Sequence, residues 1–171
     1  MALFNMPDLR AAIPRHHRLL GLDPGTKQIG LALSDVGLMI ATPYKVLPRG
    51  KLSRDAVEIK RIADTETVGG LVVGLPLSLD GSLGPAAQAV RDWAIELSAR
   101  TELPLALMDE RLSSSAVNRM LISDLDMTRK RRNEVVDKIA AAYILQAALD
   151  QPASNTQPRE REETDGGRNR D

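Results

Sequence analysis

The stretch RLLGLDPGTKQIGLALSD, residues 18–35, contains the pattern that decides the fold. Residues 18–23 form an apolar run typical of a buried strand, a Pro-Gly pair then indicates a turn, and residues 29–35 have a second strand pattern. The stretch is therefore predicted to be a β-hairpin, with Asp23 at the end of its first strand.

Strand and helix patterns continue on the C-terminal side of this hairpin. Strands are expected at 42–48, 69–76 and 105–109, and helices at about 53–64, from Pro85, at 115–122 and at 134–149. Three early strands followed by strand–helix units predict an α/β fold, a mixed five-stranded sheet flanked by helices.

The two ends of the chain differ from this central region. Pro7 and Pro14 interrupt any long element near the start, so residues 1–17 are expected to form a loosely ordered extension. Residues 152–171 contain no Val, Ile, Leu, Met or aromatic residue, which predicts a disordered C-terminal tail. The folded domain is therefore expected to span residues 18–151.

Composition excludes several classes of protein. The chain has no cysteine, so a disulfide framework, a thiolate zinc site and a cysteine nucleophile are all excluded. No apolar run approaches the roughly 20 residues of a membrane span, and the start does not resemble a secretion signal; we therefore expect a cytoplasmic protein without a membrane partner. Basic and acidic residues number 23 each, so any surface for phosphate must be local.

Acidic residues lie where a sheet of this kind forms sites, beyond the carboxyl ends of its strands. Asp23 follows the first strand, although Asp-Pro-Gly is equally common as a turn. Asp109 and Glu110 end a later strand, and strand alternation places them on opposite faces. A pair of exposed carboxylates is the simpler interpretation of those two residues.

Asp137 is expected near the start of the last helix, where a carboxylate complements the helix dipole. Its own stripe continues with Ala140, Ala141 and Ile144, a small apolar face suited to close packing on a sheet. Asp137 should therefore point inward, and a bound cation is one way to offset the cost of burying it. Carboxylates from three segments without Cys or a well-placed His favour Mg²⁺ or Mn²⁺, which can promote phosphodiester hydrolysis.

A basic run precedes this acid. It consists of Arg129, Lys130, Arg131 and Arg132, which would ordinarily form a solvated face. Because they lie just upstream of Asp137, they are also candidates for positioning phosphate.

Four motifs together resemble the YqgF family: LGLDPGTKQIGLALSD (20–35), VVGLPLSLDGS (72–82), DERLSSSAV (109–117) and VDKIAAAYILQAAL (136–149). Its members are described as pre-16S ribosomal RNA nucleases and as Holliday-junction-resolvase-like proteins. The resemblance covers about residues 18–150. It implies an RNase H-like fold and a metal-dependent nuclease that processes the 5′ end of pre-16S rRNA in ribosome biogenesis, with Mg²⁺ or Mn²⁺ as cofactor.

The resemblance also assigns roles. The catalytic and metal-binding acids of the family fall on Asp23, Glu110 and Asp137, with Asp109 held in reserve. The glycine-rich loop that shapes the cleft falls on Gly74, Pro76, Asp80, Gly81 and Ser82, and nucleic acid is expected to contact Lys27, Arg111, Lys130, Arg131 and Arg132. Gln28 stands where the family often has Arg, which removes one possible phosphate contact.

Three other functions remain open at this stage. A resolvase of branched DNA would use the same acids but would need a dimer, and we expect a monomer or weak homodimer. A sugar-kinase or actin-like ATPase shares the Asp-x-Gly-Thr turn but needs two such domains. A non-catalytic nucleic-acid-binding module would need one of the three acids to be missing, and none is.

Overall fold

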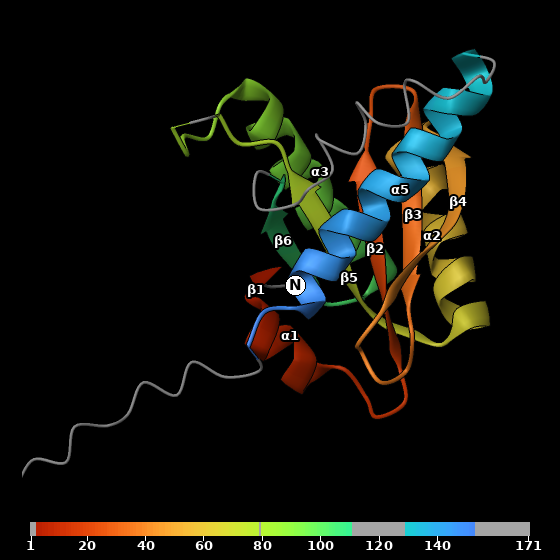
Figure 1. Cartoon of the computed structure of the whole chain (residues 1–171), viewed down its shortest axis with the longest axis vertical. Helices are drawn as coiled ribbons and strands as arrows, with labels where there is room; N and C mark the ends of the chain where they lie inside the picture. Colours follow the sequence, from red (N-terminus) through yellow and green to blue (C-terminus); the bar gives the residue numbers. More distant parts are fainter. Residues whose placement is uncertain (1–2, 79, 111–128, 153–171) are drawn as a thin grey trace, which may run out of the picture.

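The computed structural model describes residues 3–78, 80–110 and 129–152, and for residues 129–135 the backbone alone (Figure 1). Six strands form one sheet in the order β1-β6-β5-β2-β3-β4. The elements, in chain order, are β1 (Leu3–Phe4), α1 (Met6–Ala12), β2 (Arg18–Pro24), β3 (Gln28–Ser34), β4 (Ala41–Pro48), α2 (Leu52–Glu66), β5 (Val68–Leu75), α3 (Pro85–Thr101), β6 (Leu105–Asp109) and α5 (Arg129–Leu149).

The sheet is mixed, as the sequence predicts. β2, β3 and β4 form an antiparallel meander, whereas β5 pairs in parallel with β2 on one side and with β6 on the other. The carboxyl ends of β2, β5 and β6 therefore lie at one edge of the sheet (Figure 1).

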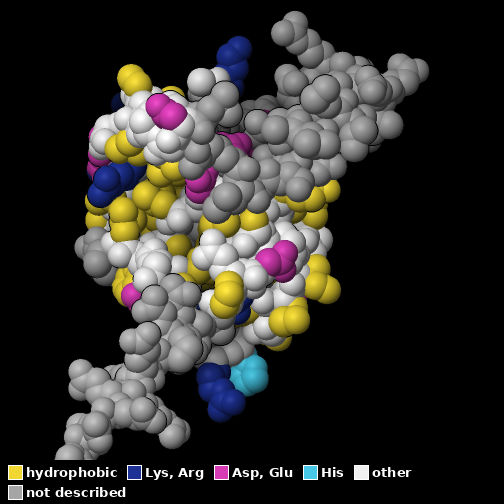
Figure 2. Space-filling model, turned by 60° about the vertical axis from the view of Figure 1, so that its left-hand side comes forward, with side chains coloured by type: hydrophobic (Ala, Val, Ile, Leu, Met, Phe, Trp, Pro, Cys, Tyr) yellow, Lys and Arg dark blue, Asp and Glu magenta, His cyan; other side chains and the backbone are white. Residues whose placement is uncertain are grey.

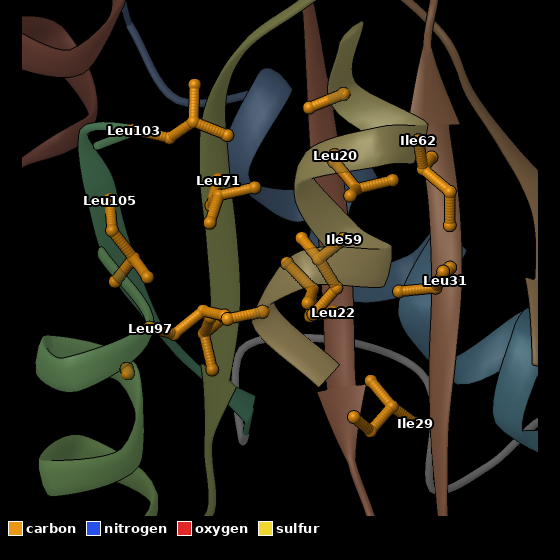
Figure 3. Packing of buried hydrophobic residues seen from close by; sticks show 14 of the residues in the cluster. Leu20, Leu22, Ile29, Leu31, Ile59, Ile62, Leu71, Leu97, Leu103 and Leu105 are labelled. Atoms are coloured by element: carbon orange, nitrogen blue, oxygen red, sulfur yellow. The ribbon is translucent and has the colours of Figure 1, made fainter. Parts of the chain in front are cut away.

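Helices cover both faces of the sheet and create two cores. On one face, α2 and α3 pack with Leu20, Leu22 and Leu71, and Figure 3 shows these side chains pointing toward α2 and α3. On the other face, α5 crosses the sheet diagonally (Figure 1) and packs with Leu19 and Val72. β5 is buried along its whole length, as expected of a central strand covered on both faces.

The N-terminal segment differs from the expectation of a loosely ordered extension. β1 pairs in parallel with β6, so the sheet has six strands and not the expected five. Asn5 caps α1 by accepting a hydrogen bond from the backbone N–H of Asp8, and Pro7 lies in the first turn, where proline is tolerated. Met6 and Leu9 are buried in the α5 core, which ties this segment to the sheet.

α5 begins earlier than the sequence pattern indicates. The helix starts at Arg129 and not near residue 134, so the basic run belongs to its first turn and Asp137 to its third. Arg and Lys are good helix formers, which explains the longer helix. The expected helix at 115–122 and the tail at 153–171 lie outside the described residues. In the part of the chain that is described, no helix is long and apolar enough to span a membrane.

Three strand glycines allow α5 to approach the sheet closely. A Cβ atom on Gly21 would lie 2.7 Å from Cβ of Leu145, and one on Gly74 would lie 2.5 Å from Cδ1 of Ile144. A Cβ atom on Gly30 would overlap the carbonyl oxygen of Asp137 and lie 2.6 Å from its carbonyl carbon. The helix therefore occupies the space that three side chains would otherwise fill.

Candidate active site

Asp23 lies at the carboxyl end of β2, in the centre of the sheet. Alternation along β2 fixes its face, because Leu20 and Leu22 belong to the α2–α3 core whereas Leu19 belongs to the α5 core. Asp23 therefore faces α5. It is half-buried, and its partner across the β2–β3 ladder is Gly30.

Asp137 lies directly above that partner. The Cβ atom of Asp137 is 3.2 Å from the position that a Cβ atom on Gly30 would take. Cβ atoms of opposite residues in an antiparallel pair are about 4.5–5.5 Å apart, so the Cβ atoms of Asp23 and Asp137 lie within about 9 Å of each other. The inward direction expected for Asp137 agrees with complete burial of Ala140, Ala141 and Ile144 on the same stripe.

Glu110 follows β6, two strands away from Asp23. Ala106 and Met108 belong to the α5 core, so alternation along β6 assigns Asp109 to the face opposite Asp23 and Asp137, whereas Glu110 lies just beyond the end of the strand. β5 separates β6 from β2, which sets these two strands about 10 Å apart. This arrangement favours Glu110 over Asp109 as the third acid.

The acidic residues of the described ranges do not converge into a complete metal site. Within 3–78, 80–110 and 136–152, no three Asp, Glu or His side chains converge closely enough to hold one ion together. The structure thus brings Asp23 and Asp137 to one region, with Glu110 farther away, just beyond the end of β6. An oxygen-only set of this kind suits Mg²⁺ or Mn²⁺, since Mg²⁺ is commonly held by one or two carboxylates together with water and phosphate oxygens.

The loop after β5 borders this region. Gly81 has a φ of 85°, a left-handed conformation that favours glycine, and its N–H donates to the carbonyl of Ser78 at 2.8 Å. The N–H of Ser82 donates to the carboxylate of Asp80 at 2.9 Å, so the turn is closed by its own polar groups. Gly74 does not belong to this loop: it lies in β5 beneath Ile144.

The structure describes some of the residues expected to contact nucleic acid and not others. Lys27 is exposed in the β2–β3 turn, four residues after Asp23. Residues 130–132 lie at the start of α5, and Arg131 precedes Asp137 by about 9 Å along the helix axis. Their side chains, and the whole of Arg111, lie outside the described residues.

Positive charge is scattered on the face of the molecule that Figure 2 shows. The described basic side chains on the face shown in Figure 2 are separated from one another by acidic and apolar ones, in keeping with a formal net charge of zero. A cavity of about 200 Å³ lies between β3, β4 and α5, lined by Gln28, Lys45, Val46, Pro48 and Lys138. Lys45 also pairs with Glu58, 3.9 Å away, so Lys138 is the other basic residue of the cavity lining.

Sequence reasoning missed two kinds of residue here. Gly21 and Gly30 allow α5 to lie close to the sheet. The sequence did contain a signal for this contact, because glycines within a strand often mark the close approach of another element, and the last helix has a face of small alanines. Arg49 donates from Nη1 to the carbonyl of Gly25 at 2.7 Å, in the turn that follows Asp23. No local pattern around Arg49 indicates this long-range contact.

The fold has a solved counterpart. RuvC of T. thermophilus, in a structure described as a complex with Holliday junction substrate, is similar with a TM-score of 0.50; the match covers 78% of this chain and 94% of that one at 13% identity. At that identity the likeness concerns the fold. The class that the likeness defines is therefore one of fold: an RNase H-like mixed sheet covered by helices on both faces.

Sequence comparison then gives the family. The family model described as "RuvX: Holliday junction resolvase" matches residues 17–151, and the chain belongs to this family, which confirms the resemblance stated above. A protein of Gluconacetobacter diazotrophicus named "Putative pre-16S rRNA nuclease" is 68% identical over 153 residues, covering 90% of this chain and 99% of its own. A protein of the same name from Gluconobacter oxydans is 61% identical over 150 residues, covering 88% and 94%. The chain is accordingly a nuclease, a hydrolase of phosphodiester bonds.

Proposed function

We propose that this nuclease cleaves structured precursor RNA, namely the 5′ end of pre-16S rRNA during ribosome biogenesis, with Asp23, Glu110 and Asp137 as its catalytic acids. The names of the two relatives support the substrate. The observation that carries the site is the position of Asp137 over Gly30, the ladder partner of Asp23. This position supports the site because the Cβ atoms of the two aspartates lie within about 9 Å of each other, at the edge where such sheets form sites.

Asp23 and Asp137 would be the primary ligands of Mg²⁺ or Mn²⁺, with Glu110 as the third. When bound, the ion lowers the pKa of water and stabilises negative charge on the phosphodiester oxygens. The reaction is hydrolysis: a water oxygen bonds to phosphorus, the bond to the leaving oxygen breaks, and that oxygen receives a proton. The carboxylates orient these groups by their fixed positions on β2 and α5.

The remaining residues hold the substrate in this proposal. Lys27, Arg111 and the basic residues 130–132 contact phosphates, which position a strand without reading its sequence. The loop containing Pro76, Asp80, Gly81 and Ser82 shapes the cleft, and Gly74 sets the depth of α5 beside it. We expect the protein to act in the cytoplasm as a monomer or weak homodimer.

The test is a single-turnover cleavage assay with Mg²⁺ or Mn²⁺ on an RNA that carries a 5′ extension ahead of a structured 16S segment. Asp23→Asn, Asp137→Asn and Glu110→Gln should each lower the rate at least about 100-fold, since even outer residues of metal sites cost 10–100-fold. Asp92→Asn removes an exposed carboxylate from α3 and serves as the matched control. Wild-type rates in Asp23→Asn would show that Asp23 is a turn residue and not a ligand.

A four-way DNA junction forms the second arm of the assay. A resolvase must cut two strands symmetrically and therefore acts as a dimer. Faster cleavage of the junction than of the RNA, together with a stable dimer in sedimentation, would replace RNA by branched DNA as the substrate.

A further inference from the structure

Arg49 holds the turn that follows Asp23 at two points. Its backbone N–H donates to the carbonyl of Lys27 at 2.9 Å, and its Nη1 donates to the carbonyl of Gly25 at 2.7 Å. The turn itself is closed by the N–H of Gly25, which donates to the carbonyl of Gln28 at 2.8 Å. One residue, directly after β4, therefore fixes the backbone that links β2 to β3, once through its backbone and once through its side chain.

The guanidinium of Arg49 is itself held from a second element. Its central carbon lies 5.5 Å from the centre of the Trp93 ring, a cation–π distance. Trp93 is 8% exposed and belongs to the core beneath α3. α3 begins directly after the loop of residues 76–84, so Arg49 connects the turn after Asp23 to the helix behind that loop.

We propose that Arg49 is a positioning residue for Asp23, acting through the carbonyl of Gly25. Gly25 lies two residues from Asp23, and a surface turn is otherwise among the least stable parts of a domain. A planar guanidinium can stack on a ring and donate from its edge at the same time, which an ammonium group does less well. The contact thus restrains the backbone two residues after Asp23 and, through it, the position of the Asp23 side chain; this role rests on the proposed function.

Three variants test the proposal in the full chain. Arg49→Met removes both donor and charge but keeps an apolar stem on Trp93, whereas Arg49→Lys retains a donor. Arg54→Met is the matched control, because Arg54 is exposed, lies five residues away and pairs only with Asp55 among the described residues. The readouts are kcat, KM for the RNA, the Mg²⁺ concentration for half-maximal activity, the melting temperature, and the amide chemical shifts of the turn.

In Arg49→Met, kcat should fall about 10-fold and the half-activating Mg²⁺ concentration should rise by a similar factor, as for outer residues of metal sites. KM for the RNA should stay within about twofold, because the substitution removes no contact between the protein and the RNA. The kcat and the half-activating Mg²⁺ concentration of Arg49→Lys should lie between those of Arg49→Met and wild type. If Arg49→Met does not fold, Arg49→Lys is used for the test in its place. The amide signals of Gly25 and Thr26 should shift in the metal-free protein, and Arg54→Met should match wild type throughout.

Unchanged kcat and unchanged Mg²⁺ activation in Arg49→Met would overturn the proposal. A raised KM with unchanged kcat would also overturn it, because the guanidinium would then contact substrate phosphate. Full activity of Asp23→Asn would instead overturn the proposed active site. The two failures are distinguishable, since the amide shifts report on the turn without any cleavage.

Discussion

Substituting Gly30 with Ala tests whether the spacing between α5 and the sheet sets the activity. The added methyl group would meet the carbonyl group of Asp137, which is helix backbone and cannot rotate away. Ordinary carbon–carbon contact requires about 3.5–4.0 Å, against 2.6 Å to the carbonyl carbon here. The helix or the strand must therefore move by about 1 Å.

The size of the effect follows from this displacement. Forcing an extra methyl group into a packed core costs about 1–3 kcal/mol, and a backbone clash belongs to the upper end of that range. For a chain of this length, about 3 kcal/mol lowers the melting temperature by about 6–12 °C. A misplacement of about 1 Å between Asp137 and Asp23 should reduce cleavage about 100-fold in protein that remains folded.

The measurement combines thermal unfolding with single-turnover cleavage well below the melting temperature. Gly74→Ala is the graded comparison, since the new methyl would meet the end of the Ile144 side chain, which can shift. Gly84→Ala is the matched control, because its nearest neighbour, Oγ of Ser78, would lie at an ordinary 3.4 Å. The reasoning fails if Gly30→Ala melts and cleaves like Gly84→Ala, or if its activity falls only in proportion to the unfolded fraction.

Three further predictions concern other parts of the chain. Leu9→Ala should destabilise the protein by about 2–5 kcal/mol, measured by urea unfolding, because Leu9 is fully buried in the α5 core. The backbone N–H groups of Ile40 and then Met39 lower the pKa of Asp35 below its ordinary value of 3.8, so its stabilising effect is present above that pH and lost as the pH falls through the folded pKa. The stability difference between wild type and Asp35→Asn should therefore be seen in urea unfolding at pH 7 and shrink as the pH is lowered below 3.8. Replacing the basic residues 130–132 with Gln should weaken RNA binding and flatten its salt dependence by a slope of roughly 2 in a log–log titration, with little change in cleavage at saturating protein.

Much of the fold could be predicted because its signals are local. The hairpin follows from two apolar runs around a Pro-Gly turn, and the observed pairing of Leu22 with Leu31 agrees with it. The inward direction of Asp137 was readable from its own helix, since Ala140 and Ala141 lie one turn further on the same stripe. Periodicity of this kind needs no knowledge of the partner element.

The remainder depends on pairings between distant segments. Even within the hairpin, a Pro-Gly pair predicts a turn but not its type and length, and these decide that Gly30, and not its neighbours, lies opposite Asp23. The joining of β1 to β6 was missed because two residues carry too little pattern to indicate a strand. Arg49 was missed for a similar reason: its partners Gly25 and Trp93 are 24 and 44 positions away.

Gly21, Gly30 and Gly74 affect both the stability of the sheet and the geometry of the proposed site. Glycine within a strand is destabilising by about 0.5–1 kcal/mol relative to Ala, so three of them weaken the sheet considerably. That loss is offset where the helix above them is buried completely, as it is at Ala141, Ile144 and Leu145.

Close approach also lets an acid as short as Asp reach the strand edge from the helix. A longer acid on a more distant helix would reach the same region only by ordering more side-chain bonds, at a greater entropic cost. The spacing between α5 and the sheet therefore matters to the proposed active site as much as to the core. Substitutions at Gly30 should change stability and cleavage activity together.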